Sequence, residues 1–288
     1  MKAYIFPGQG SQHKGMGEEL FDLFQEYVQR ADDVLGYSVV DLCLNDDKEV
    51  LGQTQFTQPA LYIVNSLSFL AKVRRYEVSA DFMVGHSLGE YSALFAAGVF
   101  DFEAGLEIVK KRGELMSQAH NGGMAAVVSC TAEKIKQILS QNSISSIDIA
   151  NFNSPNQTVV AGPVNDLDTF RKIMEEAGEI VIPLNVSAPF HSRYMKEFGE
   201  EFGEFLTQYR FGAPRIPVIS NVSAQPYKKE TVTRLLTEQL SSSVRWTDSI
   251  NYLLSIGVND FEELGPGTVL SGLVRQIKSN YQEVESVS

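Results

Sequence analysis

The feature that most constrains the fold is a serine between two glycines, placed where an apolar run gives way to a helical pattern. Residues 85–89 read GHSLG, which fits the G-x-S-x-G pattern of a nucleophile elbow. In such an elbow a sharp turn from strand to helix holds the serine hydroxyl clear of the backbone. Side chains at the two glycine positions would crowd so tight a turn. The pattern therefore predicts a strand, a turn and a helix in succession, with Ser87 at the turn.

The residues on either side of the motif supply this setting. Asp81–Val84 reads as a short buried strand, and Tyr91–Ala97 reads as a compact, alanine-rich helix. Glycine-spaced serines also arise by chance, and it is the strand–elbow–helix context that favours the catalytic interpretation. Ser87 is therefore a candidate nucleophile, and a nucleophilic serine needs a base.

Composition and charge limit the class of protein. The 288 residues can form one large domain or two unequal ones. A content of 43% hydrophobic and 21% charged residues is ordinary for a soluble globular chain. A formal net charge of −12 argues against a general nucleic-acid binder, because polyanions would be repelled.

The sequence also favours a soluble, cytoplasmic protein without a membrane partner. No apolar run approaches the roughly 18 residues of a membrane span, and the chain reaches Pro7 and Gly8 too early for a signal peptide. Cys43 and Cys130 are far apart and are expected to be reduced, although a single disulfide stays open. The four histidines show no metal-ligand spacing, so no metal site is predicted.

Strands alternate with helices through the first 120 residues, which predicts a parallel α/β sheet. Ala3–Phe6 is the first expected strand, and a helix is expected over 58–73. Asp101 is the expected N-cap of a helix that runs to about Gln118.

From about residue 121 the elements become shorter and follow a β-α-β-β-α-β order, which is typical of a ferredoxin-like unit. Its expected strands are 124–128, 147–150, 157–161 and 179–184, and its expected helices are 131–141 and 166–177. Long helices then return over 192–208 and 230–240, and a strand closes the pattern at 260–264. We therefore predict an α/β protein with a large domain, residues 1–120 and 192–288, and a small ferredoxin-like domain inserted at 121–191.

Four histidines compete to be the base for Ser87. His86 is adjacent in sequence, but neighbouring side chains at an elbow diverge. His13 and His120 lie in polar surroundings that indicate surface positions. His191 lies where the small domain is expected to rejoin the large one, and clefts between domains commonly hold active sites. His191 is therefore the best candidate.

A serine nucleophile also needs N–H groups that point at the negative charge developing on its substrate. The residue after the nucleophile, Leu88, normally supplies one of them. The glycine-rich turn at Gly8-Gln9-Gly10 offers a second, although an ordinary tight loop explains the same residues.

Arg112 lies on the apolar face of its expected helix. Its neighbours at three and four residues are all apolar: Ile108, Val109, Leu115 and Met116. An arginine buried in this way is costly unless an anion pairs with it. The anion is either a structural carboxylate or the carboxylate of a substrate, which a guanidinium binds through two hydrogen bonds.

Taken together, segments in order along nearly the whole chain resemble the malonyl-CoA:acyl-carrier-protein acyltransferases. The matching segments are FPGQGSQ (6–12), TQPA (57–60), GHSLGE (85–90), KRGELM (111–116), ANFNSP (150–155), FHS (190–192), SNV (220–222), VRW (244–246) and ELGPG (263–267). This series is far more specific than the elbow alone.

The resemblance implies an α/β-hydrolase-like core with a ferredoxin-like insertion, in agreement with the element order. Carried over to this chain, it implies that Ser87 is the nucleophile and His191 its base. In this family a main-chain carbonyl, rather than an aspartate, orients the histidine, and the Val244–Trp246 segment is where we expect that carbonyl.

The resemblance also assigns the substrate contacts. Arg112 matches the arginine that pairs with the free carboxylate of the malonyl group, and the N–H groups of Leu88 and Gln9 would form the oxyanion hole. Phe190 resembles its counterpart in malonyl-selective members, where a bulky ring crowds branched substrates. Pro189 departs from the alanine expected before it.

Two half-reactions follow from the resemblance. Ser87 attacks the thioester of malonyl-CoA and CoA leaves; the phosphopantetheine thiol of an acyl carrier protein then attacks the malonyl-serine ester. No permanently bound cofactor is implied. Carrier proteins are usually acidic, so docking calls for a local basic patch. Lys72–Arg75 and Lys110–Lys111 are candidates, although both also fit an ordinary solvated face.

Within the family, Thr54–Tyr62 and Phe100–Glu103 resemble the free-standing acyltransferases that load polyketide synthases in trans. That role is therefore favoured over fatty-acid synthesis. A proofreading acyl hydrolase of the same fold stays open, but a carboxylate clamp at Arg112 would handicap the binding of simple acyl chains. A non-catalytic docking subunit is a third reading, which Ser87, His191 and Arg112 together disfavour.

Overall fold

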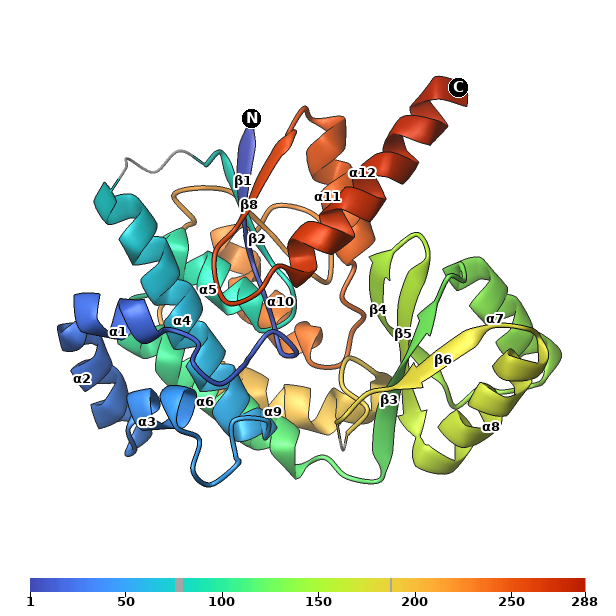
Figure 1. Cartoon of the computed structure of the whole chain (residues 1–288), viewed down its shortest axis with the longest axis horizontal. Helices are drawn as coiled ribbons and strands as arrows, with labels where there is room; N and C mark the ends of the chain where they lie inside the picture. Colours follow the sequence, from blue (N-terminus) through green and yellow to red (C-terminus); the bar gives the residue numbers. More distant parts are fainter. Residues whose placement is uncertain (76–79, 187, 288) are drawn as a thin grey trace.

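The computed structural model describes residues 1–75, 80–186 and 188–287, and its strands form two four-stranded sheets (Figure 1). The larger sheet has the order β7-β2-β1-β8, and every neighbouring pair in it is parallel. Its strands are β1 (Lys2–Phe6), β2 (Phe82–Gly85), β7 (Val218–Ile219) and β8 (Asp260–Glu263). Parallel neighbours need crossover connections, and here helices provide them and cover both faces.

The helices of this larger part surround its sheet. They are α1 (Glu18–Leu23), α2 (Gln25–Leu35), α3 (Val39–Leu44), α4 (Thr54–Arg75), α5 (Gly89–Ala96), α6 (Phe102–Gln118), α9 (Lys196–Leu206), α10 (Val232–Gln239), α11 (Trp246–Ser255) and α12 (Val269–Val287). Side chains of β1 alternate between two apolar cores. Tyr4 and Phe6 pack with α4, α5 and α6, whereas Ala3 and Ile5 pack with α11 and α12.

The smaller sheet is antiparallel, with the order β4-β5-β3-β6. Its strands are β3 (Gly122–Val128), β4 (Asp148–Ser154), β5 (Gln157–Pro163) and β6 (Ile180–Pro183), and its helices are α7 (Ala132–Gln141) and α8 (Val164–Glu176). This element order and strand order are those of a ferredoxin-like unit. The predicted fold class is confirmed; the domain limits at residues 121 and 191 stay a prediction.

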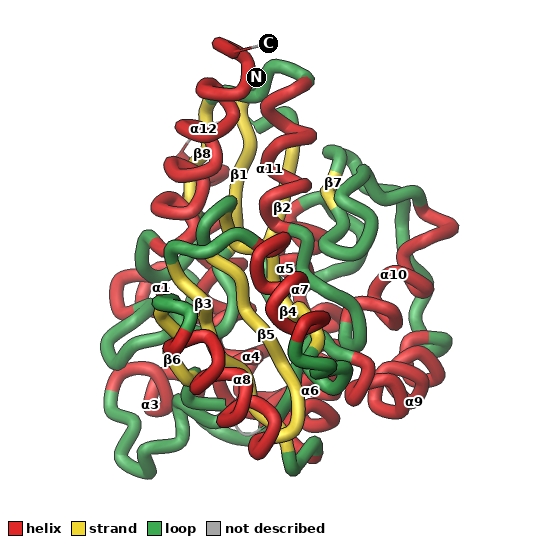
Figure 2. Tube along the Cα trace, turned by 90° about the vertical axis from the view of Figure 1, so that its right-hand side faces the viewer, coloured by secondary structure: helices red, strands yellow, loops and turns green. Residues whose placement is uncertain are grey.

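The smaller sheet packs against other elements on both faces, although Ile180 and Ile182 of its edge strand β6 are exposed. Met124 and Ala126 of β3 face the large apolar core that includes α4 and α6, whereas Ala125 and Val127 face α7 and α8. Figure 2, seen from the side of the smaller sheet, shows β3 and β5 running side by side, with α8 close to them. The two sheets therefore share one continuous region of packing.

Most predicted elements are present, and α6 has its expected limits. The Asp101 side chain caps α6 by accepting a hydrogen bond from the Ala104 N–H at 2.9 Å. Helix α4 starts at Thr54, one turn before the predicted start, with Pro59 inside it. Proline is favoured in the first turn of a helix, where it loses no hydrogen bond. Pro59 therefore indicates a helix start near residue 58, although the helix already begins at Thr54. No element is predicted from the sequence at α3, β7, α11 or α12. Strand β7 has two residues, too few to show the alternation of buried and exposed side chains that indicates a strand.

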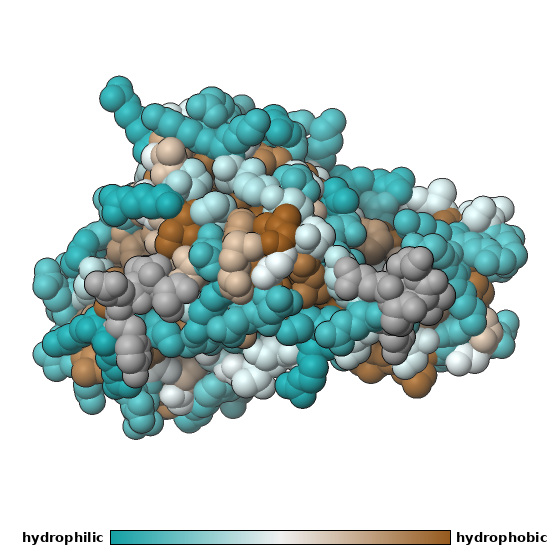
Figure 3. Space-filling model, turned by 90° about the horizontal axis from the view of Figure 1, so that it is seen from above, coloured by the Kyte–Doolittle hydropathy of each residue, from teal (hydrophilic) through white to brown (hydrophobic). Residues whose placement is uncertain are grey.

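Cys43 and Cys130 are both buried and free, so the disulfide that the sequence left open does not form. Among the described residues, no helix is long and apolar enough to cross a membrane. The same residues contain no group of three or more His, Cys, Asp or Glu side chains that could hold a metal ion. Seen from above, the surface is mostly hydrophilic, with apolar residues in small patches (Figure 3).

Candidate active site

Ser87 lies in a sharp turn between β2 and α5, with a φ of 51°. A Cβ on Gly85 would lie 1.9 Å from the main-chain carbon of Gly89, and a Cβ on Gly89 would lie 2.0 Å from the carbonyl oxygen of Phe6. Real Cβ atoms do not approach backbone so closely, so both positions require glycine. The glycine spacing in the sequence is therefore a steric consequence of the turn.

Two buried amide side chains hold the main chain of Ser87. The Ser87 N–H donates to Asn221 Oδ1 at 2.7 Å, and Asn221 Nδ2 donates to the Gly85 carbonyl at 2.7 Å. On the other side, Gln239 Nε2 donates to the Ser87 carbonyl at 3.0 Å. The Ser87 carbonyl also accepts from the Glu90 N–H at 3.1 Å, so the two amides complete the hydrogen bonding of a residue that belongs to neither strand nor helix.

His191 contacts the Ser87 hydroxyl, with 2.7 Å between Nε2 and Oγ. Its other ring nitrogen, Nδ1, lies 2.8 Å from the carbonyl oxygen of Gln239. A carbonyl can only accept, so Nδ1 carries the proton and Nε2 is left to accept from Ser87. The backbone at His191 has a φ of 58°, and its N–H donates to the Leu240 carbonyl at 3.1 Å.

The expectation that the Val244–Trp246 segment orients His191 is wrong, because the carbonyl belongs to Gln239, the last residue of α10. The 244–246 segment has other partners. The Val244 carbonyl accepts from the Phe152 N–H at 2.9 Å, and the Val244 N–H donates to the Ala150 carbonyl at 2.8 Å. Val244 thus joins the edge of the smaller sheet instead of reaching the histidine.

Burial lowers the pKa of His191 from 6.5 to about 3, and the positive charge of Arg112 acts in the same direction. Its hydrogen bond to Gln239 opposes this shift only partly. His191 is therefore a neutral imidazole near pH 7, in the state that accepts a proton from a hydroxyl group.

The other histidines lie elsewhere. His13 and His120 are exposed. The His86 ring points away from the Ser87 hydroxyl: its Nε2 lies 2.8 Å from Asn153 Oδ1, and its ring centre is 5.6 Å from that of Trp246.

Arg112 is fully buried, and one of its nitrogens reaches the serine. Nη2 donates to Ser87 Oγ at 3.1 Å and to Gln239 Oε1 at 3.0 Å, while Nη1 donates to Gln58 Oε1 at 2.7 Å. The guanidinium carbon lies 5.3 Å from the centre of the Tyr91 ring. Among the described residues, Arg112 forms no ion pair, and its Nε has no hydrogen-bond partner. No structural carboxylate in the ranges that the structure describes therefore contacts the guanidinium; the buried Glu90 interacts with its charge only at longer range, and both groups hydrogen-bond to Gln239.

The main-chain N–H groups of Leu88 and Gln9 donate to no acceptor in the described part of the chain. The turn that carries Gln9 is packed against the elbow, since a Cβ on Gly8 would lie 2.4 Å from the His86 carbonyl oxygen. Asn65 Nδ2 holds this turn by donating to the Pro7 carbonyl at 2.9 Å. Two free N–H groups on adjoining turns are what an oxyanion hole requires.

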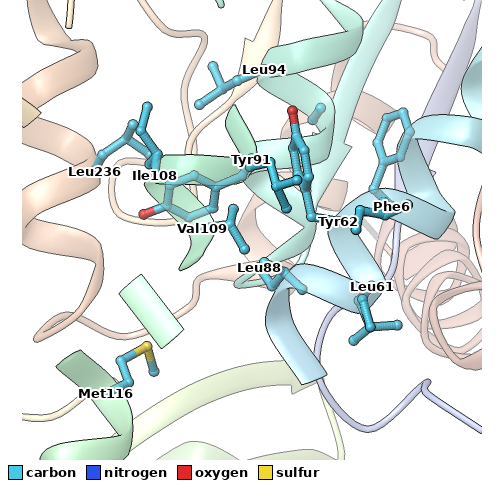
Figure 4. Packing of buried hydrophobic residues seen from close by; sticks show 14 of the residues in the cluster. Phe6, Leu61, Tyr62, Leu88, Tyr91, Leu94, Ile108, Val109, Met116 and Leu236 are labelled. Carbon is cyan, nitrogen blue, oxygen red and sulfur yellow. The ribbon is translucent and has the colours of Figure 1, made fainter. Parts of the chain in front are cut away.

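Apolar side chains fix the walls of the site. Leu88 and Tyr91 lie among buried side chains of α4 and α6, including Leu61 and Val109 (Figure 4). Phe190, directly before His191, is 5% exposed and packs into the same core. Pro189, where the sequence departs from the family, packs against Gly122, because a Cβ there would lie 2.5 Å from its ring.

His191 also borders a surface groove of about 600 Å³. Its lining includes three partly exposed serines, Ser241–Ser243, and two cationic residues, Lys136 and Arg193. Arg193 is engaged by Asp148 in an ion pair. Lys136 is exposed, and its ammonium lies 5.5 Å from the centre of the Phe152 ring.

Three of the five basic side chains in the segments expected to dock a partner have partners within the chain, whereas Arg74 and Arg75 are exposed. Lys72 pairs with Glu262, and α4 ends near the N-terminus of the chain, at the opposite end of the large sheet from the elbow (Figure 1). Lys110 donates to the Val34 carbonyl at 2.9 Å, and Lys111 pairs with Glu201 at 2.8 Å.

Sequence reasoning missed three residues of this site: Gln58, Asn221 and Gln239. Gln58 and Asn221 lie in segments that carry the family resemblance, which was the only signal for them. Gln239 stands alone in an amphipathic helix and offers no signal in the sequence.

Comparisons with known proteins agree with this geometry. Residues 3–287 match the family model described as "Acyl transferase domain". The chain is 52% identical to the polyketide biosynthesis malonyl CoA-acyl carrier protein transacylase PksC of Bacillus subtilis strain 168, covering 97% of this chain and 98% of that protein.

Solved structures share the fold of the chain along nearly its whole length. Malonyl CoA-acyl carrier protein transacylase from Burkholderia pseudomallei has a TM-score of 0.94 and 46% identity, covering 97% of this chain and 98% of that one. The complex PlMCAT:AntF, a type II PKS acyl-carrier protein with its malonyl-transacylase, gives a TM-score of 0.92 and 34% identity, covering 96% and 93%. From the elbow, the buried cation beside it and similarity along nearly its whole length, the chain belongs to the acyl transferase family.

Proposed function

We propose that this chain transfers a malonyl group from malonyl-CoA to the phosphopantetheine thiol of an acyl carrier protein, through a malonyl ester of Ser87. The observation that carries the proposal is a fully buried arginine without a carboxylate partner, 3.1 Å from a serine hydroxyl that is also paired with a neutral histidine. A guanidinium in that position selects a substrate that brings its own carboxylate.

In the first half-reaction the Ser87 oxygen attacks the thioester carbonyl and its proton passes to Nε2 of His191. The N–H groups of Leu88 and Gln9 stabilise the negative charge on the carbonyl oxygen. The bond to sulfur breaks, and the proton on His191 accompanies the departing CoA thiolate. Arg112 exchanges part of its hydrogen bonding to oxygens of the protein for the malonyl carboxylate.

In the second half-reaction the phosphopantetheine thiol, and not water, attacks the malonyl ester of Ser87. His191 accepts the thiol proton as sulfur attacks the malonyl ester, and it returns a proton to the Ser87 oxygen when the ester bond breaks. The chemistry uses side chains of this chain with no bound cofactor, and the carrier protein brings the phosphopantetheine. Phe190, packed behind His191, favours malonyl over branched substrates by limiting space.

The role favoured is loading of a polyketide synthase in trans, in the cytoplasm. It rests on the segments 54–62 and 100–103 and on the similarity to a polyketide biosynthesis transacylase. A fatty-acid role would use the same chemistry with a different carrier protein.

A comparison of three acyl-CoA substrates tests the proposal. The purified chain is incubated with malonyl-CoA, methylmalonyl-CoA or acetyl-CoA, with and without carrier protein, and both proteins are followed by intact mass. We expect malonyl transfer to the carrier and little free acid. Rapid release of free acid, especially from acetyl-carrier, would instead identify a proofreading hydrolase.

A further inference from the structure

Glu90 is a fully buried carboxylate, three residues after Ser87, that the reaction above does not use. Its Oε1 accepts from the Asn221 N–H at 2.9 Å and from the Tyr227 hydroxyl at 2.7 Å. Its Oε2 accepts from Nε2 of Gln239. A buried charge persists only when it is hydrogen-bonded in this way.

Two of these donors are the residues that hold the elbow. Asn221 holds the Ser87 N–H and the Gly85 carbonyl, and Gln239 holds the Ser87 carbonyl. Each carboxylate oxygen of Glu90 therefore binds one of the two residues whose side-chain amides hold the main chain of Ser87: Oε1 binds the main-chain N–H of Asn221, and Oε2 binds the side-chain amide of Gln239.

Together with the Ser87 carbonyl, the charge of Glu90 also fixes which way the Gln239 amide faces. A carboxylate only accepts hydrogen bonds, so Gln239 has to turn its nitrogen toward Glu90. Its oxygen is then turned toward Arg112, whose Nη2 donates to it at 3.0 Å. A flipped amide would present a donor to the guanidinium, which is itself only a donor. The main-chain carbonyl of the same Gln239 orients His191.

We infer that Glu90 is a positioning residue. By binding Asn221 and Gln239 it holds Ser87 in place and orients Arg112 toward the site where the substrate carboxylate binds. The inference rests on the roles proposed above for Ser87 and Arg112.

The surroundings of Glu90 make its ionisation measurable near neutral pH. Burial raises the pKa of its carboxyl to about 7, against the opposing effect of its three hydrogen bonds and the charge of Arg112. Tyr91 and Tyr227 are the other titratable groups around it, and burial raises the pKa of each well above its usual value. His191, with its pKa lowered to about 3, does not titrate there either. As the pH falls below about 7, Glu90 gains a proton, and its hydrogen bonds with Asn221 and Gln239 weaken.

The first variant is Glu90→Gln, which keeps the size and removes the charge. Its amide would face a donor on one side whichever way it turned, so either Asn221 or Gln239 loses its acceptor at residue 90 and shifts from its position. We expect kcat for malonyl transfer to fall roughly 10²-fold, the size that small misplacements produce. The loss in kcat/KM should be larger for malonyl-CoA than for acetyl-CoA, since Arg112 is misdirected. Glu114→Gln, an exposed carboxylate two residues from Arg112 on α6, is the matched control and should behave as the wild type.

The second variant is Tyr227→Phe, which removes one donor to Glu90 without touching Asn221 or Gln239. Losing that donor destabilises the ionised carboxylate and raises its pKa. In Tyr227→Phe we expect the acid limb of the kcat/KM profile to move to higher pH. In Glu90→Gln we expect that limb to be absent, so that kcat/KM is low and does not change with pH in this range. If Glu90→Gln does not fold by circular dichroism, the shift in Tyr227→Phe decides alone.

The inference is overturned if Glu90→Gln retains the wild-type rate, if it keeps the wild-type acid limb, or if Tyr227→Phe leaves that limb in place. The same mass assay separates this result from a failure of the proposed function. A wild type that forms no malonyl-enzyme at any pH refutes the function, whereas the role of Glu90 is judged from the variants relative to an active wild type.

Discussion

The nucleophile, its base and the cation beside them are linked through one residue, Gln239. Its side-chain oxygen accepts from Arg112, its nitrogen donates to the Ser87 carbonyl, and its main-chain oxygen orients His191. In the described structure Arg112 makes hydrogen bonds to three oxygens and no ion pair. It is thus held in place yet still has its charge available to an incoming carboxylate.

Replacing Arg112 by alanine should change which substrate is used. We expect kcat/KM for malonyl-CoA to fall roughly 10²-fold or more, the usual loss when one partner of a buried charge pair is removed. Acetyl-CoA, which has no free carboxylate, should be affected much less. Steady-state kinetics with both thioesters measure the ratio.

Arg234→Ala is the control, because that arginine is exposed on α10 and pairs only with Glu238. An equal loss for the two substrates in Arg112→Ala would contradict a carboxylate clamp and indicate a structural role.

At the level of elements, the elbow works because two turns meet at the carboxyl edge of the parallel sheet. β1 and β2 are neighbours, with Phe6 paired to Gly85, so the turns that follow them lie side by side. Helix α5 starts in the second turn, and α6 then brings Arg112 back to the same edge.

The N-cap of α6 offers a test at this scale. Asp101→Ala removes the hydrogen bond to the Ala104 N–H and should lower the free energy of unfolding by about 1 kcal/mol. For a chain of this size that corresponds to a fall in Tm of roughly 2–4 °C. Because Arg112 lies three turns away, the transfer rate should stay unchanged. Asp168→Ala, on the solvent side of α8, is the control in the same melting experiment, and an equal shift there would argue against a capping effect.

The sequence predicted most of these elements but not all of the site. The elbow, the capped α6 and the ferredoxin-like order were readable because each follows from local periodicity or from a steric need for glycine. Gln239 was not readable, because its role depends on where α10 ends in space. The carbonyl that orients His191 was placed in the wrong segment for the same reason: every residue has a carbonyl, so sequence cannot single one out.

At the scale of the whole molecule, the site lies where the two sheets adjoin, and we expect a phosphopantetheine arm to enter through the groove that borders His191. The groove carries Lys136 and three serines, while the chain as a whole is strongly acidic. Arg193 of the groove is paired with Asp148, so the exposed Lys136 is the cation that favours an acidic partner locally, despite the repulsion expected from a net charge of −12.

Reversing that charge should weaken carrier binding. We expect Lys136→Glu to raise the KM for the carrier protein about tenfold, with kcat little changed, because rim charges act mainly on encounter. The effect should shrink with added salt. Lys134→Glu, on the same helix but paired with Glu179 outside the groove, is the control. A similar rise in both variants would place the docking surface elsewhere.

Malonyl transfer as proposed here requires that the malonyl group is carried on Ser87. The most direct measurement is peptide mapping by mass spectrometry after malonyl-CoA is mixed with the wild type, Ser87→Ala and Ser92→Ala, the last being a buried serine one turn along α5. We expect a malonyl group on the peptide containing Ser87 in the wild type and in Ser92→Ala, and none in Ser87→Ala. Malonyl on another residue, or its persistence in Ser87→Ala, would show that Ser87 is not the nucleophile.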